Sequence, residues 1–250
     1  MNKYIIAAFI TFSLFSCEKS VYLNRIETQQ INVSDSIVGD QTIEAYIKPY
    51  RENINKNLDS VLAYSVGTYS KSDGELNTAI GNMMADAIYE QANPIYKNRT
   101  GEDIDFVLLN HGGIRSIISK GNVTTRTAFE IMPFENTIVV ATLKGEQIKE
   151  LLDYLSESKR AHPFSQLKII LDQEGNFNSA NIKNQPIDYS KSYNVATNDY
   201  LYNGGNRMDF FKKNQGVENI DYKVRKALID YFTKIDTLNP KRDDRFIQMN

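Results

Sequence analysis

Hydrophobic residues at three- and four-residue steps predict four helices in this chain. Each run places its apolar residues on one face, as in a helix that packs by one side. In the first run Pro49 marks a kink or a late start. The predicted helices are 42–62, a segment after a cap at Asn77 or Thr78, a segment after Gly145, and 224–235 ahead of Pro240.

Short continuous apolar runs between these segments predict strands. The run 106–109 lies between Asp105 and Asn110, and unbroken apolarity over that length is typical of a strand buried on both faces. The similar runs are 137–143, 167–171 and 193–197. Helices interleaved with buried strands predict a layered α+β domain.

The first residues have the pattern of an export signal. Lys3 precedes a short apolar stretch that ends at Ser16 and Cys17. The residues 14–17 resemble a bacterial lipobox, which predicts cleavage after Ser16 and lipid attachment to Cys17. A simple anchor helix, or a signal cut elsewhere, is the alternative. Cys17 is the only cysteine, which excludes an intrachain disulfide and a cysteine-ligated metal site.

The domain organisation follows from these patterns. We predict a lipoprotein signal peptide at 1–16, a polar tether at 17–40 and one domain at 41–250. No second long apolar run follows the signal. We therefore expect an exported protein held to a bacterial membrane by its lipid, in the periplasm or at the cell surface.

The charge balance argues against nucleic acid as a partner. Lys plus Arg number 29 and Asp plus Glu number 31, for a formal net charge of -2. No long basic run occurs either, whereas nucleic-acid binding proteins usually concentrate basic residues on one face.

The first candidate site follows the strand predicted at 106–109. Asn110 can donate and accept hydrogen bonds, Gly112 and Gly113 let backbone N–H groups approach a ligand, and Arg115 offers a planar fork for a phosphate or carboxylate. Strand ends are where open sheets usually bind ligands. The alternative is a tight turn with an exposed arginine.

Two further segments carry aromatic residues beside strand ends. Phe134 follows Pro133, which stiffens the approach, so its ring can serve as a stacking face; the alternative is a core position. Tyr200 follows the strand predicted at 193–197, and a glycine pair and Asn206 come after it. Together, two rings and two glycine loops can clamp a base and its sugar.

These segments resemble the C-terminal domain of the 5'-nucleotidase family. The matching strings are TAIGNMMADAI, NHGGIR, MPFEN and NDYLYNGGN, in that order, within residues 60–235. The resemblance implies a mixed sheet flanked by helices. It also implies that Asn110 and Arg115 contact the phosphate or sugar, that Phe134 and Tyr200 sandwich the base, and that Asn206 lies against the ribose hydroxyls.

The chain departs from the family pattern at three places. Tyr200 stands where the family usually has Phe, which preserves stacking and adds a hydroxyl. Asn206 stands where the family usually has Asp, which weakens a charge-assisted bond to ribose. Glu75 and Leu76 lie where family members tend to carry an extra Arg, so a phosphate contact is expected to be missing.

No catalytic residues are predicted in this chain. A two-metal phosphoesterase centre needs many His, Asp and Asn ligands, and the chain has two histidines, His111 and His162, the latter on an expected surface loop. Asp243 and Asp244 are read as part of a solvated polar tail. In the family, a separate metallophosphoesterase domain holds the two divalent metals. We therefore expect a nucleotide-binding half that acts with a separate metallophosphoesterase chain; the alternative is a non-catalytic nucleotide-binding lipoprotein.

Overall fold

The computed structural model describes residues 22–34 and 36–249. The predicted signal peptide and Cys17 lie outside these residues. The chain divides into two units, Met1–Lys48 and Pro49–Asn250, with the boundary inside helix α2 (Gln41–Leu58). Within the described part, none of the helices combines the length and the apolarity needed to cross a bilayer.

Helix α2 confirms the first helical pattern but ends earlier than predicted. Asp40 caps its start, since its Oδ1 accepts the N–H groups of Thr42 and Ile43 at 2.8 and 3.1 Å. None of its residues is buried. The prediction that the helix continues to 62 was wrong, because Val61 and Leu62 belong to strand β1.

The remaining predicted helices are present in the second unit. Thr78 caps α3, because its side chain accepts the Gly81 N–H at 3.2 Å, and Gly101 ends the helix in a left-handed conformation. The helices are α3 (Ala79–Thr100), α4 (Thr125–Ile131), α5 (Gly145–Ser158), α6 (Asp199–Tyr202) and α7 (Val224–Lys234). Helices α4 and α6 were not predicted.

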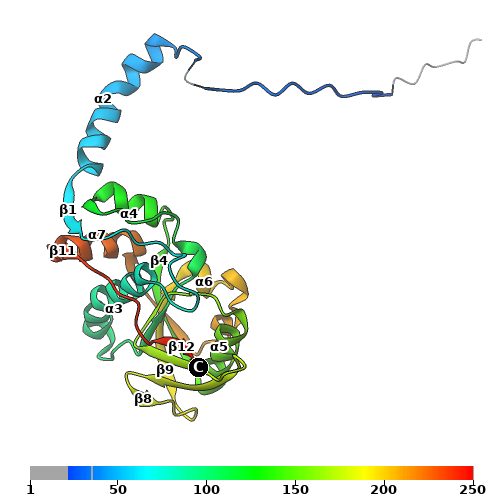
Figure 1. Ribbon diagram of the computed structural model, residues 1–250, viewed down its shortest axis with the longest axis vertical. Coiled ribbons are helices and arrows are strands. Elements are labelled where there is room, and N and C mark those ends of the chain that lie inside the picture. Colours follow the sequence, from blue (N-terminus) through cyan, green and yellow to red (C-terminus); the bar gives the residue numbers. More distant parts are fainter. Residues whose placement is uncertain (1–21, 35, 250) are drawn as a thin grey trace, which may run out of the picture. The chain divides into compact units, whose positions relative to one another are not determined.

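Three sheets organise the second unit (Figure 1). The central sheet has the order β10 (Gly216–Lys223), β4 (Thr137–Lys144), β9 (Ser192–Asn198), β2 (Phe106–Leu108) and β5 (Phe164–Ser165). A three-stranded sheet has the order β11 (Thr237–Leu238), β1 (Val61–Ser65) and β3 (Gly121–Thr124). A four-stranded sheet has the order β12 (Phe246–Gln248), β6 (Leu167–Leu171), β7 (Phe177–Ile182) and β8 (Gln185–Pro186).

Strands β2, β4 and β9 of the central sheet are largely buried, as the continuous apolar runs predicted, whereas the edge strand β10 is mostly exposed. In β2, Val107 packs into one core with α3 and α7, while Phe106 and Leu108 pack into a second core with α5. Figure 1 shows α3 and α5 on opposite sides of the sheet. The prediction of a layered α+β domain with a mixed sheet flanked by helices is therefore confirmed.

Strand directions bring three separate segments to one edge of the central sheet. β2 runs parallel to β9, so the carboxyl ends of both strands lie on the same side. β4 is antiparallel to β9, and its first residues pair with the last of β9, Ile138 with Asn198. The segments after β2, before β4 and after β9 therefore meet there.

Arg245, just ahead of strand β12, ties this segment to α3 and β5. The guanidinium bonds both oxygens of Asp86 at 3.0 and 2.9 Å, Asp243 at 2.7 Å and the carbonyl of Phe164 at 2.7 Å. Only 16% of the Arg245 side chain is exposed. Asp243 is exposed, as the sequence reading expected, and it also belongs to this ion network.

Candidate functional site

One pocket of about 670 Å³ lies where the three segments meet. The seven residues that the sequence singled out all line it: Asn110, Gly112, Gly113, Arg115, Phe134, Tyr200 and Asn206. Glu135 and Asn136, which the sequence analysis did not select, complete the lining. Their binding roles remain predictions, but the fold places all of them around one space.

The loop after β2 forms the first wall. Asn110 is 8% exposed, and its Oδ1 accepts a long hydrogen bond from Asn198 at the end of β9, at 3.5 Å. A Cβ on Gly113 would lie 3.1 Å from that same oxygen, so glycine leaves room for the amide. The two strand ends are thus joined by side chains at the base of the pocket.

Arg115 forms the exposed rim of this wall. The Arg115 backbone N–H donates to the Ile131 carbonyl at 2.9 Å, which ties the loop to the end of α4. Its guanidinium carbon lies 5.9 Å from the centre of the Phe134 ring, within the range of a cation–π contact. Lys71 donates to the carbonyl of Ile114 at 2.8 Å and adds positive charge behind the loop.

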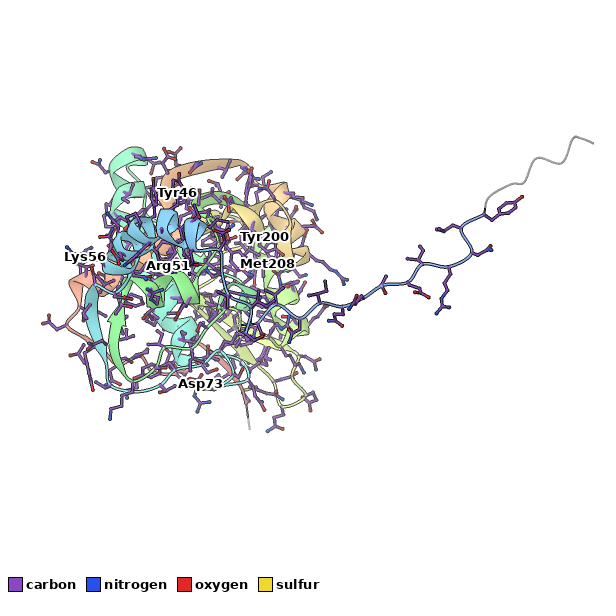
Figure 2. The ribbon with its side chains drawn as sticks, turned by 90° about the horizontal axis from the view of Figure 1, so that it is seen from above. Tyr46, Arg51, Lys56, Asp73, Tyr200 and Met208 are labelled. Atoms are coloured by element: carbon purple, nitrogen blue, oxygen red, sulfur yellow. The ribbon has the colours of Figure 1, made fainter. Side chains whose placement is uncertain are left out.

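The segment after β9 forms the second wall. Asn198 caps α6 by accepting the Leu201 N–H at 2.9 Å, and Tyr200, labelled in Figure 2, is 49% exposed. Gly205 is required beside it, because a Cβ there would lie 2.5 Å from the Tyr200 ring. Asn206 adopts a left-handed conformation, and its carbonyl accepts the Tyr154 hydroxyl at 3.0 Å.

The segment before β4 forms the third wall. Phe134 is 43% exposed, so it is not the core residue that the alternative reading placed there. Asn136 donates to Asp199 at 2.7 Å, which links this wall to α6. Glu135 forms an ion pair with Arg225 at the start of α7. The two half-exposed rings of Phe134 and Tyr200 thus come from separately anchored segments.

His162 supports the first wall from below. It is 2% exposed, so the expectation of a surface loop was wrong. Its Nδ1 accepts the backbone N–H of His111 at 3.3 Å, at the start of the short helix η2 (His111–Gly113). Burial, together with the nearby His111 and Arg160, lowers the pKa of His162 to about 4, so the ring is neutral at neutral pH.

The two histidines lie next to each other behind the first wall. His111 and His162 are neighbours, but one His162 ring nitrogen already accepts a backbone N–H, and His111 Nδ1 lies 3.2 Å from the Ala161 carbonyl. Among residues 22–34 and 36–249, no three of His, Cys, Asp and Glu gather closely enough to hold an ion. The pocket itself is lined by amides, rings, two glycines, one arginine and one ion-paired carboxylate.

A comparison with known proteins identifies the family of this domain. The family described as "5'-nucleotidase, C-terminal domain" matches residues 60–213, more than half of the chain. The chain belongs to that family. All three walls of the pocket lie within the matched residues, whereas Arg225 lies outside them.

Two curated relatives and one solved structure show the extent of the likeness. Protein UshA of Escherichia coli strain K12 is 30% identical over 149 residues, which are 56% of this chain and 26% of that protein. Cell wall protein Lmo0130 of Listeria monocytogenes is 29% identical over 185 residues, 68% of this chain and 23% of that protein. The 5'-nucleotidase precursor from Thermus thermophilus shares the fold with a TM-score of 0.68 at 22% identity, covering 84% of this chain and 43% of that one.

This 5'-nucleotidase C-terminal domain spans about a quarter of the length of the curated relatives it matches. The family assignment therefore identifies the domain and its fold. Glu135 and Asn136 were missed although they directly follow Phe134 in the sequence, because neither has a pattern that marks a ligand contact.

Proposed function

We propose that this domain binds a nucleotide or nucleoside between Phe134 and Tyr200, as the binding half of a 5'-nucleotidase-type phosphohydrolase. One observation carries the proposal: three segments far apart in the sequence place two half-exposed rings, an arginine and several amides around a single pocket. A volume of about 670 Å³ is within the usual range for small-molecule sites.

Each part of a nucleotide finds a matching group. A base has two π faces, and half-exposed rings on opposite segments can cover both of them. Arg115 supplies a planar, permanently charged fork for phosphate. Asn206 and Asn110 carry amides that can bond ribose hydroxyls or base edges. The family's description as 5'-nucleotidase supports the same ligand class.

Calorimetry with AMP, adenosine and a nucleotide sugar tests the binding. Replacing Phe134 by Ala should weaken adenosine binding by about 1–3 kcal/mol, the usual cost of losing a stacked ring. Tyr189→Ala is the matched control, since Tyr189 is 47% exposed and does not line the pocket. Equal affinities in all three proteins would place the ligand elsewhere.

A second polypeptide is proposed to supply the hydrolytic metals. The motivation is that a two-metal reaction needs clustered ligands, and no three of His, Cys, Asp and Glu among the described residues gather closely enough to hold an ion. Adding this domain to a purified metallophosphoesterase chain should raise the rate of AMP hydrolysis. If AMP is bound but the rate stays that of the metal chain alone, the domain is a nucleotide-binding lipoprotein without a catalytic role.

We also propose export and lipid attachment at Cys17. The support is the signal pattern that ends at Ser16, together with a relative named as a cell wall protein. Cys17→Ala should release the protein from the membrane fraction while leaving AMP affinity unchanged. Retention of the variant in the membrane would rule out lipid at this position.

A further inference from the structure

Arg225, a buried residue outside the pocket, reaches the segment that forms the third wall. It lies in the first turn of α7 and is 8% exposed. Its Nη1 donates to the Met132 carbonyl at 3.3 Å, its Nη2 pairs with Glu135, and its guanidinium carbon lies 4.0 Å above the centre of the Phe129 ring.

The guanidinium group of Arg225 makes contacts through both its face and its edge. Its face covers Phe129, and its nitrogens reach the backbone at one end of the 132–136 segment and the side chain of Glu135 within it. At the other end, the Val224 N–H donates to the Asn136 carbonyl at 3.0 Å. Since Val224 is 1% exposed and packs into the core, α7 is a fixed anchor for both ends of the segment.

The same ion pair sets the charge of the pocket. Glu135 and Arg115 are the charged residues in its lining. The Glu135 side chain is 70% exposed, so a free carboxylate there would repel a phosphate group. Arg225 compensates that charge, and the exposed Arg115 lines the same pocket. Positive charge at the rim is thus left available for a ligand.

We propose that Arg225 is a positioning residue for the pocket: it clamps the segment that carries Phe134 and compensates Glu135, which favours anionic over neutral ligands. The second effect rests on the proposed nucleotide-binding function, while the clamp does not. Both act through Glu135 and the backbone, since Arg225 does not line the pocket.

Four variants separate charge from position: Arg225→Met, Arg225→Lys, Glu135→Gln and the double variant R225M/E135Q. Calorimetry gives the affinity for AMP and for adenosine in each. Arg225→Met should weaken AMP binding by about tenfold or more, and adenosine binding by less, because it exposes the Glu135 charge as well as loosening the ring. Arg225→Lys should recover part of the loss, because it keeps the charge without the planar fork.

Glu135→Gln should fold normally, because the Glu135 side chain is 70% exposed. Glu135→Gln should raise the ratio of AMP affinity to adenosine affinity by about two- to fivefold at low salt, because it removes the carboxylate charge and a shift of the Phe134 ring affects both ligands. The double variant should regain AMP affinity relative to Arg225→Met without regaining adenosine affinity. Equal changes for AMP and adenosine in every variant would overturn the charge effect.

Hydrogen exchange tests the clamp without any ligand. Peptides that cover 131–136 should exchange faster in Arg225→Met than in the unmodified protein, while peptides from α5 should not change. Unchanged exchange at 131–136 would overturn the clamp. If the unmodified protein bound neither AMP nor adenosine, the proposed function and the charge effect would fail together, and the exchange result would still decide the clamp.

Discussion

The buried His162 makes a quantitative prediction about stability and pH. The pKa of His162 is lowered to about 4 in the folded protein, mainly by burial and also by the positive charge of His111 and Arg160. Its reference value is 6.5. As the pH falls between these values, the unfolded chain takes up a proton at this residue and the folded chain does not, so the free energy of unfolding decreases.

The size of the effect follows from that pKa difference. A shift of one pKa unit corresponds to about 1.4 kcal/mol, so His162 should remove up to about 3 kcal/mol of stability by the time the pH reaches about 4, and no more below it. Burial also lowers the pKa of His111, which is half-buried, so it contributes in the same direction.

His162→Gln isolates this contribution. A glutamine cannot titrate, yet its side-chain oxygen can still accept the His111 N–H. Urea unfolding followed by far-UV circular dichroism, between about pH 7 and about pH 4.5, should show a flatter stability profile for the variant than for the unmodified protein. Carboxylates titrate in both proteins and cancel in the comparison. Identical profiles would mean that the folded protein binds the proton at His162 as readily as the unfolded chain, contrary to its burial.

Three further perturbations have defined outcomes. Arg115→Ala should weaken AMP binding by about 1.5–3 kcal/mol and adenosine binding much less, because the lost interaction is with the phosphate; calorimetry measures both. Gly205→Ala should weaken adenosine binding by about 1–3 kcal/mol, because the new Cβ would lie 2.5 Å from the Tyr200 ring and 2.6 Å from the Tyr200 carbonyl oxygen and so displaces this wall; unchanged affinity would show that the wall does not contact the ligand. Arg245→Met should cost about 2 kcal/mol of stability, since it leaves the half-exposed Asp86 and Asp243 without their cation. Denaturant unfolding tests that value, and an unchanged midpoint would show that the network contributes nothing.

The sequence predicted those helices and strands that can be recognised from their own residues alone. The continuous apolar run at 106–109 gave a strand buried on both faces, and Thr78 gave the start of α3. The first helix was extended too far because Val61 and Leu62 continue the apolar spacing of α2 by coincidence. They belong instead to β1, a strand that pairs with β3 and β11, and such partner strands cannot be seen in a local window.

Only part of the pocket could be predicted, because some of its contacts join residues that are distant in the sequence. Glycine pairs and aromatics after apolar runs mark loops at strand ends, and the resemblance to a known family joined those loops into one site. No local pattern links Glu135 to Arg225, because they lie far apart in the sequence and only the packing of α7 brings them together. His162 was misplaced because a histidine before a proline resembles a surface turn, whereas the fold buries it beneath η2.

The meeting of three strand ends has a consequence for finding the natural ligand. The pocket walls are continuous with β2, β4 and β9, so a molecule that grips all three walls is coupled to unfolding of the entire central sheet. A ligand present at about a hundred times its dissociation constant adds about 2.7 kcal/mol to the free energy of unfolding. Melting the purified domain against a panel of metabolites should therefore rank candidates by the rise in melting temperature, with no enzymatic readout required.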